Sequence, residues 1–265
     1  MGAVREFELE GWQAAAASYA GFAGATRLFV PALLQAAGAG AGVRLLDVAC
    51  GPGFATAAAA AAGAEATGVD FSSAMLLMAR SLHPAVPFRH GDAEDLPFAD
   101  ASQDAVVANF GIHHVERPER AFAEVHRVLR PQGTFAFTFW ADPRDNTPWC
   151  ILVDAIKAHG RLDVAMPAGN SVHATPESFT RLVAAAGFSA ETVRHELITQ
   201  GWSLPPQADL VTIFESGTVR TATLLRGQGD ALPAIRHDVA QAMQRYLRDG
   251  RVVLPTRAFL MLATK

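Results

Sequence analysis

The sequence predicts an α/β protein built on a seven-stranded, mostly parallel sheet with helices on both faces. Two observations predict this fold. Along most of the chain, single helical segments separate segments of strand character, and that order requires parallel pairing with right-handed crossovers. In addition, the apolar segment 43–49 runs into the glycine turn Gly51-Pro52-Gly53, and the next strand ends in Asp70. Strand, glycine turn, helix, strand and carboxylate is the order in which α/β proteins build a site for a nucleoside-containing ligand.

Strands are expected where short segments of apolar and β-branched residues are bounded by turn residues. They are residues 43–49, 65–70, 86–91, 104–110, 134–140, 193–199 and 257–264. Helices are expected where apolar residues recur at helical spacing, and Ser72, Pro118 and Thr175 are typical of helix starts. The expected helical segments are residues 10–38, 54–62, 72–82, 118–129, 149–159, 176–186, 206–226 and 232–248.

We expect one structural domain with three parts. Residues 1–42 form a helical N-terminal cover, residues 43–140 form the ligand-binding core, and residues 141–265 complete the sheet. Within the last part, residues 141–174 and 202–250 interrupt the alternation of helices and strands. Segments beyond the carboxyl ends of strands are where α/β folds place substrate contacts, so these two insertions are expected to form a lid.

Composition and charge exclude several classes of function. The chain has 265 residues, and its 26 acidic and 22 basic residues give a net charge of −4 without a basic block. A nucleic-acid partner is therefore not expected, since nucleic-acid-binding surfaces are strongly basic. The N-terminus lacks the apolar stretch of a secretory signal, and no apolar run suits membrane insertion. The cysteines Cys50 and Cys150 suggest no disulfide framework, so the cytoplasm is the expected location.

Three interpretations of the turn Gly51-Pro52-Gly53 compete. It is a tight connection that any α/β protein needs, a dinucleotide-binding loop, or a seat for another nucleoside. A dinucleotide loop requires a third glycine, where this chain has Thr56. Asp47, just before the turn, would also repel a pyrophosphate at the helix N-terminus, but it suits a ligand with an ammonium or sulfonium group. The turn therefore favours S-adenosylmethionine over a nicotinamide or flavin dinucleotide.

Five sequence landmarks follow one another in a fixed order. They are residues 47–53, 68–72, 91–98, 104–110 and 129–133. In this order they resemble the class I S-adenosylmethionine-dependent methyltransferases, which have a Rossmann-like fold, and most of all the small-molecule branch that includes ubiquinone and menaquinone methyltransferases. Ala49 stands where many relatives have the first glycine of the turn, and a small residue still fits there. The resemblance implies S-adenosyl-L-methionine as methyl donor, S-adenosyl-L-homocysteine as product and a small-molecule acceptor.

The resemblance also implies roles for residues of the core. Asp70 would accept hydrogen bonds from both ribose hydroxyls, Asp92 would accept from the adenine amino group, and the Ala93 amide would donate to a ring nitrogen. Further residues would flank the adenine or face the methionine end: Phe71, Met75, Asp47, Ala49, Gly51, Asn109 and Phe110. In relatives an N-terminal aromatic residue often covers the ligand. Tyr19 is the candidate here, although Trp12 and Tyr19 share a helical face and such a stripe is more often core.

Two adjacent histidines, His113 and His114, follow the fourth strand at the ligand edge of the sheet. One of them is a candidate general base for an acceptor that must lose a proton. The alternative is a loop histidine that caps local backbone. A metal is not expected, because the spacing from these histidines to Glu116 matches no standard ligand set.

The acceptor site is expected in or beside the lid segments. Its candidate residues are Trp140, Trp149, His173, Trp202, Phe214 and Arg220. The aromatic members suggest an apolar or aromatic acceptor, while each alone is typical of core. Asn109 is followed by Phe110, so the chain lacks the Asn/Asp-Pro-Pro-Tyr/Phe signature of enzymes that methylate amino groups of nucleic acids and proteins. The alternative function is a ligand-binding protein of the same fold with a non-methylating or regulatory role.

Overall fold

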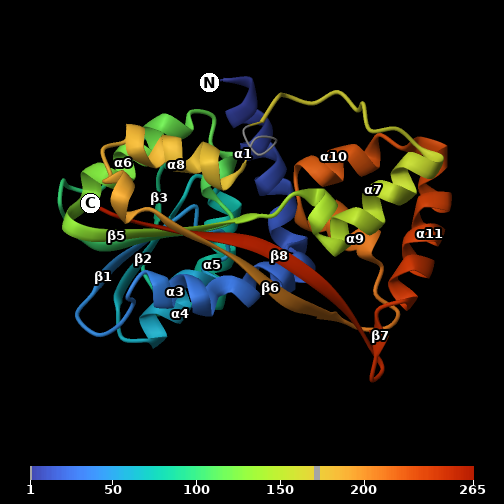
Figure 1. The fold of residues 1–265 in the computed structure, drawn as a ribbon, viewed down its shortest axis with the longest axis horizontal. Helices are drawn as coiled ribbons and strands as arrows, with labels where there is room; N and C mark the ends of the chain where they lie inside the picture. Colours follow the sequence, from blue (N-terminus) through green and yellow to red (C-terminus); the bar gives the residue numbers. More distant parts are fainter. Residues whose placement is uncertain (1, 170–173) are drawn as a thin grey trace.

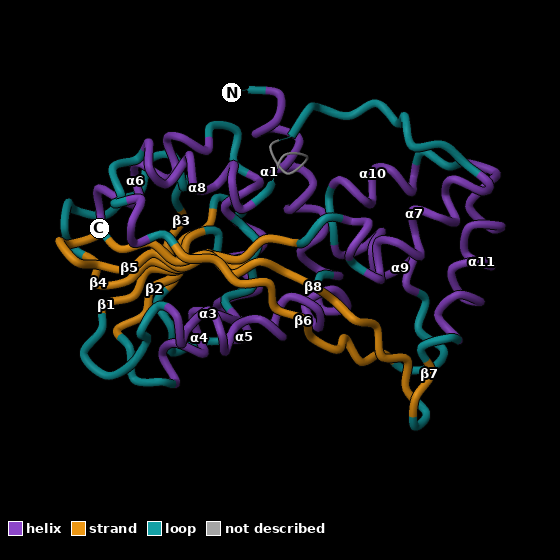
Figure 2. Tube along the Cα trace, viewed as in Figure 1, coloured by secondary structure: helices purple, strands orange, loops and turns teal. Residues whose placement is uncertain are grey.

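The computed structural model describes residues 2–169 and 174–265. Their strands form one eight-stranded sheet in the order β3-β2-β1-β4-β5-β8-β6, with the short β7 paired to β8 (Figure 2). The strands are β1 (Arg44–Val48), β2 (Glu65–Asp70), β3 (Phe88–His90), β4 (Gln103–Asn109), β5 (Leu129–Trp140), β6 (Arg194–Leu204), β7 (Leu247–Arg248) and β8 (Arg251–Thr264). Strands β1 to β5 pair in parallel, and β8 runs antiparallel to both β5 and β6. The predicted mostly parallel sheet is confirmed, and β7 is an additional two-residue strand.

Two layers of helices cover the sheet. The helices are α1 (Ala3–Ala15), α2 (Ala20–Thr26), α3 (Val30–Ala36), α4 (Phe54–Ala61), α5 (Ser73–Leu82), α6 (Pro118–Val128), α7 (Thr147–His159), α8 (Pro176–Ala185), α9 (Leu210–Gly217), α10 (Arg220–Arg226) and α11 (Leu232–Gln244). Successive residues of a strand point to opposite faces. On β5, Phe135 and Phe137 therefore pack with α6 and α8, whereas Ala136 packs with α3 and α4. Figure 1 shows these two layers above and below the sheet.

The C-terminal helices form a second apolar cluster beside the far end of β6 and β8 (Figure 1). Helices α7, α9 and α11 pack there with Trp202 of β6 and Leu254 of β8. These helices come from the two segments that interrupt the sequence pattern. Among the helices that the structure describes, none has the length and apolar character needed to cross a membrane.

Several element boundaries differ from the sequence prediction: β5 starts at Leu129 instead of residue 134, and the expected helix 206–226 is divided into α9 and α10. The N-terminal helical region starts at Ala3 instead of residue 10, and short 3-10 turns divide it into α1, α2 and α3. The early start has a tertiary cause, since Arg5 and Glu8 form ion pairs with side chains distant in sequence. Strands β6 and β8 are also longer than expected because their eleven paired residues supply each other with hydrogen-bond partners. The start of the expected lid segment 202–250 is therefore strand.

Candidate ligand-binding site

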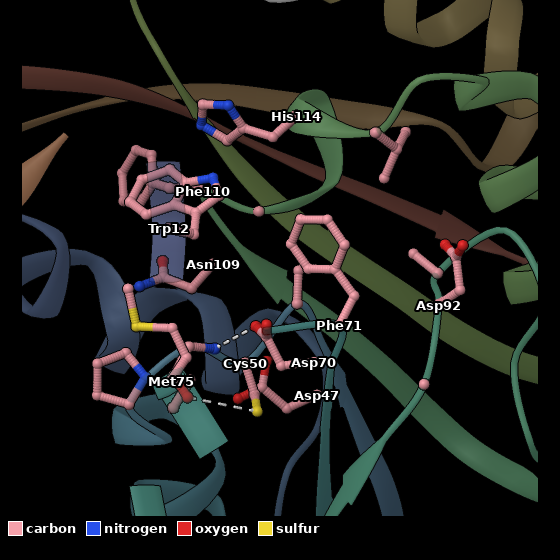
Figure 3. Close-up of a pocket in the computed structure, with 18 of the residues that line it drawn as sticks. Trp12, Asp47, Cys50, Asp70, Phe71, Met75, Asp92, Asn109, Phe110 and His114 are labelled. Carbon is pink, nitrogen blue, oxygen red and sulfur yellow. Dashed lines mark hydrogen bonds between the residues drawn. The ribbon is translucent and has the colours of Figure 1, made fainter. Parts of the chain in front are cut away.

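A pocket lies at the carboxyl ends of β1, β2 and β4, where the chain leaves the sheet (Figure 3). Its lining includes every residue that the sequence assigned to the nucleoside ligand: Tyr19, Asp47, Ala49, Gly51, Asp70, Phe71, Met75, Asp92, Ala93, Asn109 and Phe110. Helix α1 contributes Arg5 and Trp12 to the same pocket. The residues predicted to act together thus lie together, and the role of each toward a ligand stays a prediction.

The turn between β1 and α4 brings backbone close to the pocket. Ala49, Gly51 and Gly53 all have positive φ angles, of 55°, 51° and 78°. A side chain at Gly53 would stand 2.4 Å from the ring of Phe88, so only glycine fits there. Ala49 keeps a Cβ in the left-handed region, at a cost of roughly 1–2 kcal/mol. This strain at the pocket wall is the kind of local cost that functional sites carry.

Gly111 explains how the chain accommodates alanine at position 49. A Cβ on Gly111 would lie 2.5 Å from the Cβ of Ala49. The two loops that follow β1 and β4 therefore approach each other as closely as one missing side chain allows. The absence of a side chain at Gly111 therefore leaves the space that the Cβ of Ala49 occupies.

Asp47, at the end of β1, is a buried carboxylate with an incomplete set of partners. Its side chain is 1% exposed, and the Thr56 hydroxyl donates to its Oδ2 at 2.6 Å. Its Oδ1 is buried and has no hydrogen-bond partner among the described residues. Burial raises the pKa of Asp47 to about 7, since desolvation disfavours the charged form. A cationic ligand group beside Oδ1 would reverse that effect.

Asp70, at the end of β2, is held by backbone amides. The amides of Gly51 and Ser72 donate to its two carboxylate oxygens, each at 2.8 Å. Burial raises the pKa of Asp70 to about 6, against the opposing effect of these two hydrogen bonds. Each oxygen keeps a lone pair, so the carboxylate can accept further hydrogen bonds from two neighbouring hydroxyls.

Asp92 is joined to the N-terminal helix. The Nε of Arg5 donates to Oδ2 of Asp92 at 3.0 Å, and the second nitrogen of the guanidinium lies 2.7 Å away. The other oxygen, Oδ1, accepts from the amide of Glu94 at 3.0 Å. Sequence reasoning missed Arg5, because nothing in the local pattern connects α1 with the loop after β3. The ion pair holds α1 over this side of the pocket.

Asn109 and Phe110 leave β4 in a conformation set by the neighbouring strand. The buried hydroxyl of Thr138 donates to Oδ1 of Asn109 at 2.8 Å and accepts from the amide of Phe110 at 3.1 Å. Phe110 has a φ of 59°, and its ring stacks on Trp140 with centroids 3.8 Å apart. The backbone at this point is therefore fixed by one hydroxyl and one aromatic stack.

The roof of the pocket contains a buried glutamate that the sequence did not reveal. Glu8 of α1 is 1% exposed, and its Oε1 lies 2.8 Å from Nε of Arg220 while its Oε2 lies 3.2 Å from Nδ1 of His114. The indole nitrogen of Trp12 donates to Oε2 at 3.1 Å. Burial raises the pKa of Glu8, but His114 and Arg220 outweigh it, and the net pKa is lowered. The available signal was an acidic residue one helical turn before Trp12.

The two candidate histidines have different surroundings. His114 lines the pocket, and its ring lies 5.2 Å from that of Trp12. His113 is buried and does not line the pocket, and burial holds its pKa well below the usual range. The structure therefore separates the pair, and only His114 can meet a ligand directly.

The expected acceptor residues are placed differently from the prediction, because none of the described ones lines the pocket. Trp202 and Phe214 are 2% and 0% exposed and pack around Phe22, which corrects them to core residues. Trp140 and Trp149 pack against each other behind Phe110. These rings pack in one apolar cluster with Phe22 and with helices α7, α9 and α11.

Arg220 and His173 are the two remaining candidates for the acceptor site. Arg220 is engaged by Glu8 and also donates to the carbonyl of Pro167 at 2.8 Å, so it supports the roof from α10. His173 lies outside the described residues. Within residues 2–169 and 174–265, no three His, Cys, Asp or Glu side chains gather in a way that would hold a metal ion.

Comparison with known proteins shows what this chain is similar to. Residues 46–137 match the family model described as a methyltransferase domain. The chain is 40% identical to a demethylmenaquinone methyltransferase from Renibacterium salmoninarum, over 45% of this chain and 51% of that protein. It is 34% identical to a demethylmenaquinone methyltransferase from Beutenbergia cavernae, over 60% of this chain and 64% of that protein. The chain therefore spans only about half to under two thirds of the length of these curated relatives.

Solved structures extend the likeness to the whole fold. A SAM-dependent methyltransferase from Thermotoga maritima superimposes with a TM-score of 0.52 and covers 91% of both chains at 18% identity. At that identity the likeness shows a shared Rossmann-like fold. Together with the family model, it confirms the resemblance that the ordered sequence landmarks predicted.

Proposed function

We propose that this chain, whose residues 46–137 match the model of a methyltransferase domain, uses S-adenosyl-L-methionine to methylate a small apolar or aromatic molecule. The observation that carries the proposal is the pair of buried carboxylates, Asp47 and Asp70, in one pocket. Burial raises the pKa of both, so their charged forms are costly until a cation or hydrogen-bond donors join them. The ammonium and sulfonium groups of S-adenosyl-L-methionine would supply positive charge near Asp47 and its ribose hydroxyls would donate to Asp70, whereas a pyrophosphate has the wrong sign.

The pocket residues fit the parts of this molecule. Asp70 offers two oxygens to the ribose hydroxyls, and the unpartnered Oδ1 of Asp47 faces the methionine end directly or through water. Phe71 and Met75 would flank the adenine, with Asp92 and the Ala93 amide at its edge. The methionine end would lie against Ala49, Gly51, Asn109 and Phe110, under Tyr19. When bound, the molecule supplies a methyl group already activated by the positive sulfur.

The chain's own contribution to such a reaction is alignment and exclusion of water. Methyl transfer is an in-line displacement, so the rate depends on holding the acceptor atom opposite the sulfur. Trp12, Tyr19 and Phe110 give the pocket apolar walls, and the ion pair of Arg5 with Asp92 holds α1 across it. These features keep competing water from the activated methyl group.

An enzyme is favoured over a binding protein of the same fold because the relatives are named as methyltransferases. Their names give demethylmenaquinone, a naphthoquinone, as substrate, and this supports an acceptor with an aromatic ring system here. The negative net charge supports the absence of a nucleic-acid partner. We also propose a cytoplasmic location, which the unpaired Cys50 and Cys150 support.

Titration calorimetry with the purified protein tests the first part of this proposal. We expect S-adenosyl-L-methionine and S-adenosyl-L-homocysteine to bind and NAD not to bind. Formation of S-adenosyl-L-homocysteine with naphthols or naphthohydroquinones as acceptors tests the second part. Binding of NAD without S-adenosyl-L-methionine would contradict the proposal, and binding without turnover on any acceptor would favour the non-methylating alternative.

A further inference from the structure

We propose that Glu8 positions His114 as the proton acceptor of this site, and that the methyl acceptor is therefore a hydroxyl-bearing aromatic molecule. The inference rests on the proposed methyltransferase function and names the chemistry of its second substrate. It assigns a catalytic role to His114 and a positioning role to Glu8 and Arg220.

The contact between Glu8 and His114 selects one form of the imidazole ring. Oε2 of Glu8 lies 3.2 Å from Nδ1 of His114. A carboxylate beside one ring nitrogen favours the tautomer that carries its hydrogen there, and it orients the ring. Nε2 then keeps its lone pair and can accept a proton. His114 itself lines the pocket (Figure 3).

Arg220 stabilises the charged form of the buried Glu8 side chain. Its Nε lies 2.8 Å from Oε1 of Glu8, and both side chains are largely shielded from water, at 16% and 1% exposure. Trp12 fixes the other oxygen with a hydrogen bond of 3.1 Å. The carboxylate therefore has one hydrogen bond, from Trp12, and two close nitrogen-bearing neighbours, Arg220 at 2.8 Å and His114 at 3.2 Å, whose contacts are ion-pair distances without hydrogen-bond geometry.

The charged and titratable groups around His114 come from three parts of the chain, and Glu8 is the anion among them. Glu8 faces it from α1, His113 lies beside it with ring centroids 4.2 Å apart, and Arg220 reaches the same carboxylate from α10. Burial and the positive neighbours keep His113 neutral, since its pKa is held well below the usual range. Glu8 is thus the anion that would stabilise a protonated His114.

The aromatic walls near His114 argue for the acceptor's ring. Trp12 contacts His114 edge-on and Tyr19 lies next to Trp12, with centroids 5.2 Å and 6.1 Å apart. Aromatic rings prefer such edge and offset contacts, and an aromatic acceptor would extend the series. A proton acceptor is needed only when the acceptor must lose a proton at or before transfer. Together the two features point to a phenol, naphthol or hydroquinone.

For a hydroxyl acceptor, methylation consists of one proton transfer and one displacement at the methyl carbon. The hydroxyl proton passes to Nε2 of His114, and the acceptor atom forms its new bond to the methyl carbon with the released electron pair. The carbon–sulfur bond breaks, and its electrons stay on sulfur, which becomes neutral. His114 returns its proton to solvent after product release, and no oxidant or metal is required.

The test uses Glu8→Gln and His114→Gln, with Glu6→Gln as the matched control on the exposed side of the same helix. The first readout is the ¹⁵N spectrum of the histidine rings in protein saturated with S-adenosyl-L-homocysteine. We expect wild type and Glu6→Gln to show His114 protonated at Nδ1, and Glu8→Gln to lose that preference. His114→Gln assigns the signal. An Nε2-protonated ring in wild type, or an unchanged ring in Glu8→Gln, would overturn the pairing.

The second readout is turnover of a panel of phenols, naphthols and naphthohydroquinones. We expect His114→Gln to lower kcat about 100-fold or more and Glu8→Gln about 10-fold, with little change in KM for the methyl donor. If Glu8→Gln does not fold, His114→Gln alone decides. Full activity of His114→Gln, or no turnover of this panel by wild type, would overturn the inference. Failure of wild type to bind S-adenosyl-L-methionine would instead overturn the proposed function.

Discussion

The floor of the pocket is formed by the strand-end residues Asp47 and Asp70, and its roof by Glu8, His114 and Arg220. The pKa of a buried carboxyl is raised in the floor and lowered in the roof. Asp47 in the floor and Glu8 in the roof are each 1% exposed. Burial raises the pKa of Asp47 to about 7, whereas in Glu8 the same burial is outweighed by His114 and Arg220 and the net pKa is lowered. Equal burial thus gives opposite pKa shifts, because the roof places Arg220 and His114 beside its carboxylate.

We therefore expect the floor to bind the ligand and the roof to stabilise the fold around it. The floor keeps an anion without a cation, which costs stability in the free protein and becomes favourable when a cationic ligand arrives. The roof completes its charges within the chain and so holds α1, α10 and the loop after β4 together. Substitutions in the roof and in the floor should therefore have different effects on stability and binding.

The largest effect is expected from Glu8→Ala. Removal of the carboxylate leaves Arg220 buried without its partner, which costs about 3–5 kcal/mol of unfolding free energy. Urea denaturation followed by circular dichroism measures the change, and Glu6→Ala on the same helix is the control. A loss below about 1 kcal/mol would mean that the roof ion pair contributes no more than a surface pair.

Asp70→Ala tests the floor through the ligand. We expect the affinity for S-adenosyl-L-methionine to fall by about 1–3 kcal/mol, the usual cost of losing hydrogen bonds to a charged group. Titration calorimetry measures the dissociation constant, and folding is checked by thermal melting. An unchanged dissociation constant would show that Asp70 does not bind the ribose.

Asp47→Asn tests the floor through stability and pH. A carboxyl whose pKa is raised on folding, here from 3.8 to about 7, binds its proton more tightly in the folded state. Its contribution to the free energy of unfolding therefore falls as pH rises across that range. We expect the ligand-free variant to be more stable than wild type at pH 8, by about 1–2 kcal/mol after the cost of an imperfectly paired amide.

The same variant has a control with the opposite sign. Asp104 is paired with Arg44 and Arg130, and the hydrogen bond from Arg44 lowers its pKa to about 2. Asp104→Asn should therefore lower stability at neutral pH, and that difference should vanish in acid. Thermal melts of both variants across the pH range decide the matter. An Asp47→Asn variant less stable than wild type at pH 8 would refute the account of the floor.

The smallest effect is expected from Arg5→Gln. The pair with Asp92 is partly exposed, at 30% and 27% for the two side chains, so it contributes about 0.2–1 kcal/mol. Amide hydrogen exchange of α1 should quicken while global stability barely changes. Exchange in α1 identical to that of wild type would show that Arg5 does not hold the helix over the pocket.

The floor could be predicted from the sequence because its residues are consecutive landmarks. Each strand end carries a candidate side chain at a fixed distance from the glycine turn, so the placement of Asp47, Asp70 and Asp92 in one pocket follows from the order of the elements. The sheet was predictable for the same reason. Local pattern and parallel pairing leave little freedom in where these strand ends meet.

The roof could not be predicted because its residues meet only through tertiary contacts. Glu8 and Arg220 lie on helices more than two hundred positions apart, and a charge on an amphipathic helix normally indicates a solvated face. Trp202 and Phe214 were misplaced for a related reason. An aromatic side chain in an insertion can face a ligand or a neighbouring helix, and only packing decides between them.

The most direct test of the central claim is calorimetric titration of the free protein with S-adenosyl-L-methionine at pH 6.5 in two buffers of different ionisation enthalpy. The floor carboxylates, with pKa values of about 7 and about 6, are partly protonated there. A cationic ligand should lower both pKa values, so we predict release of protons on binding, and a smaller release for Asp47→Asn. Binding without proton release, equal in wild type and Asp47→Asn, would contradict the account.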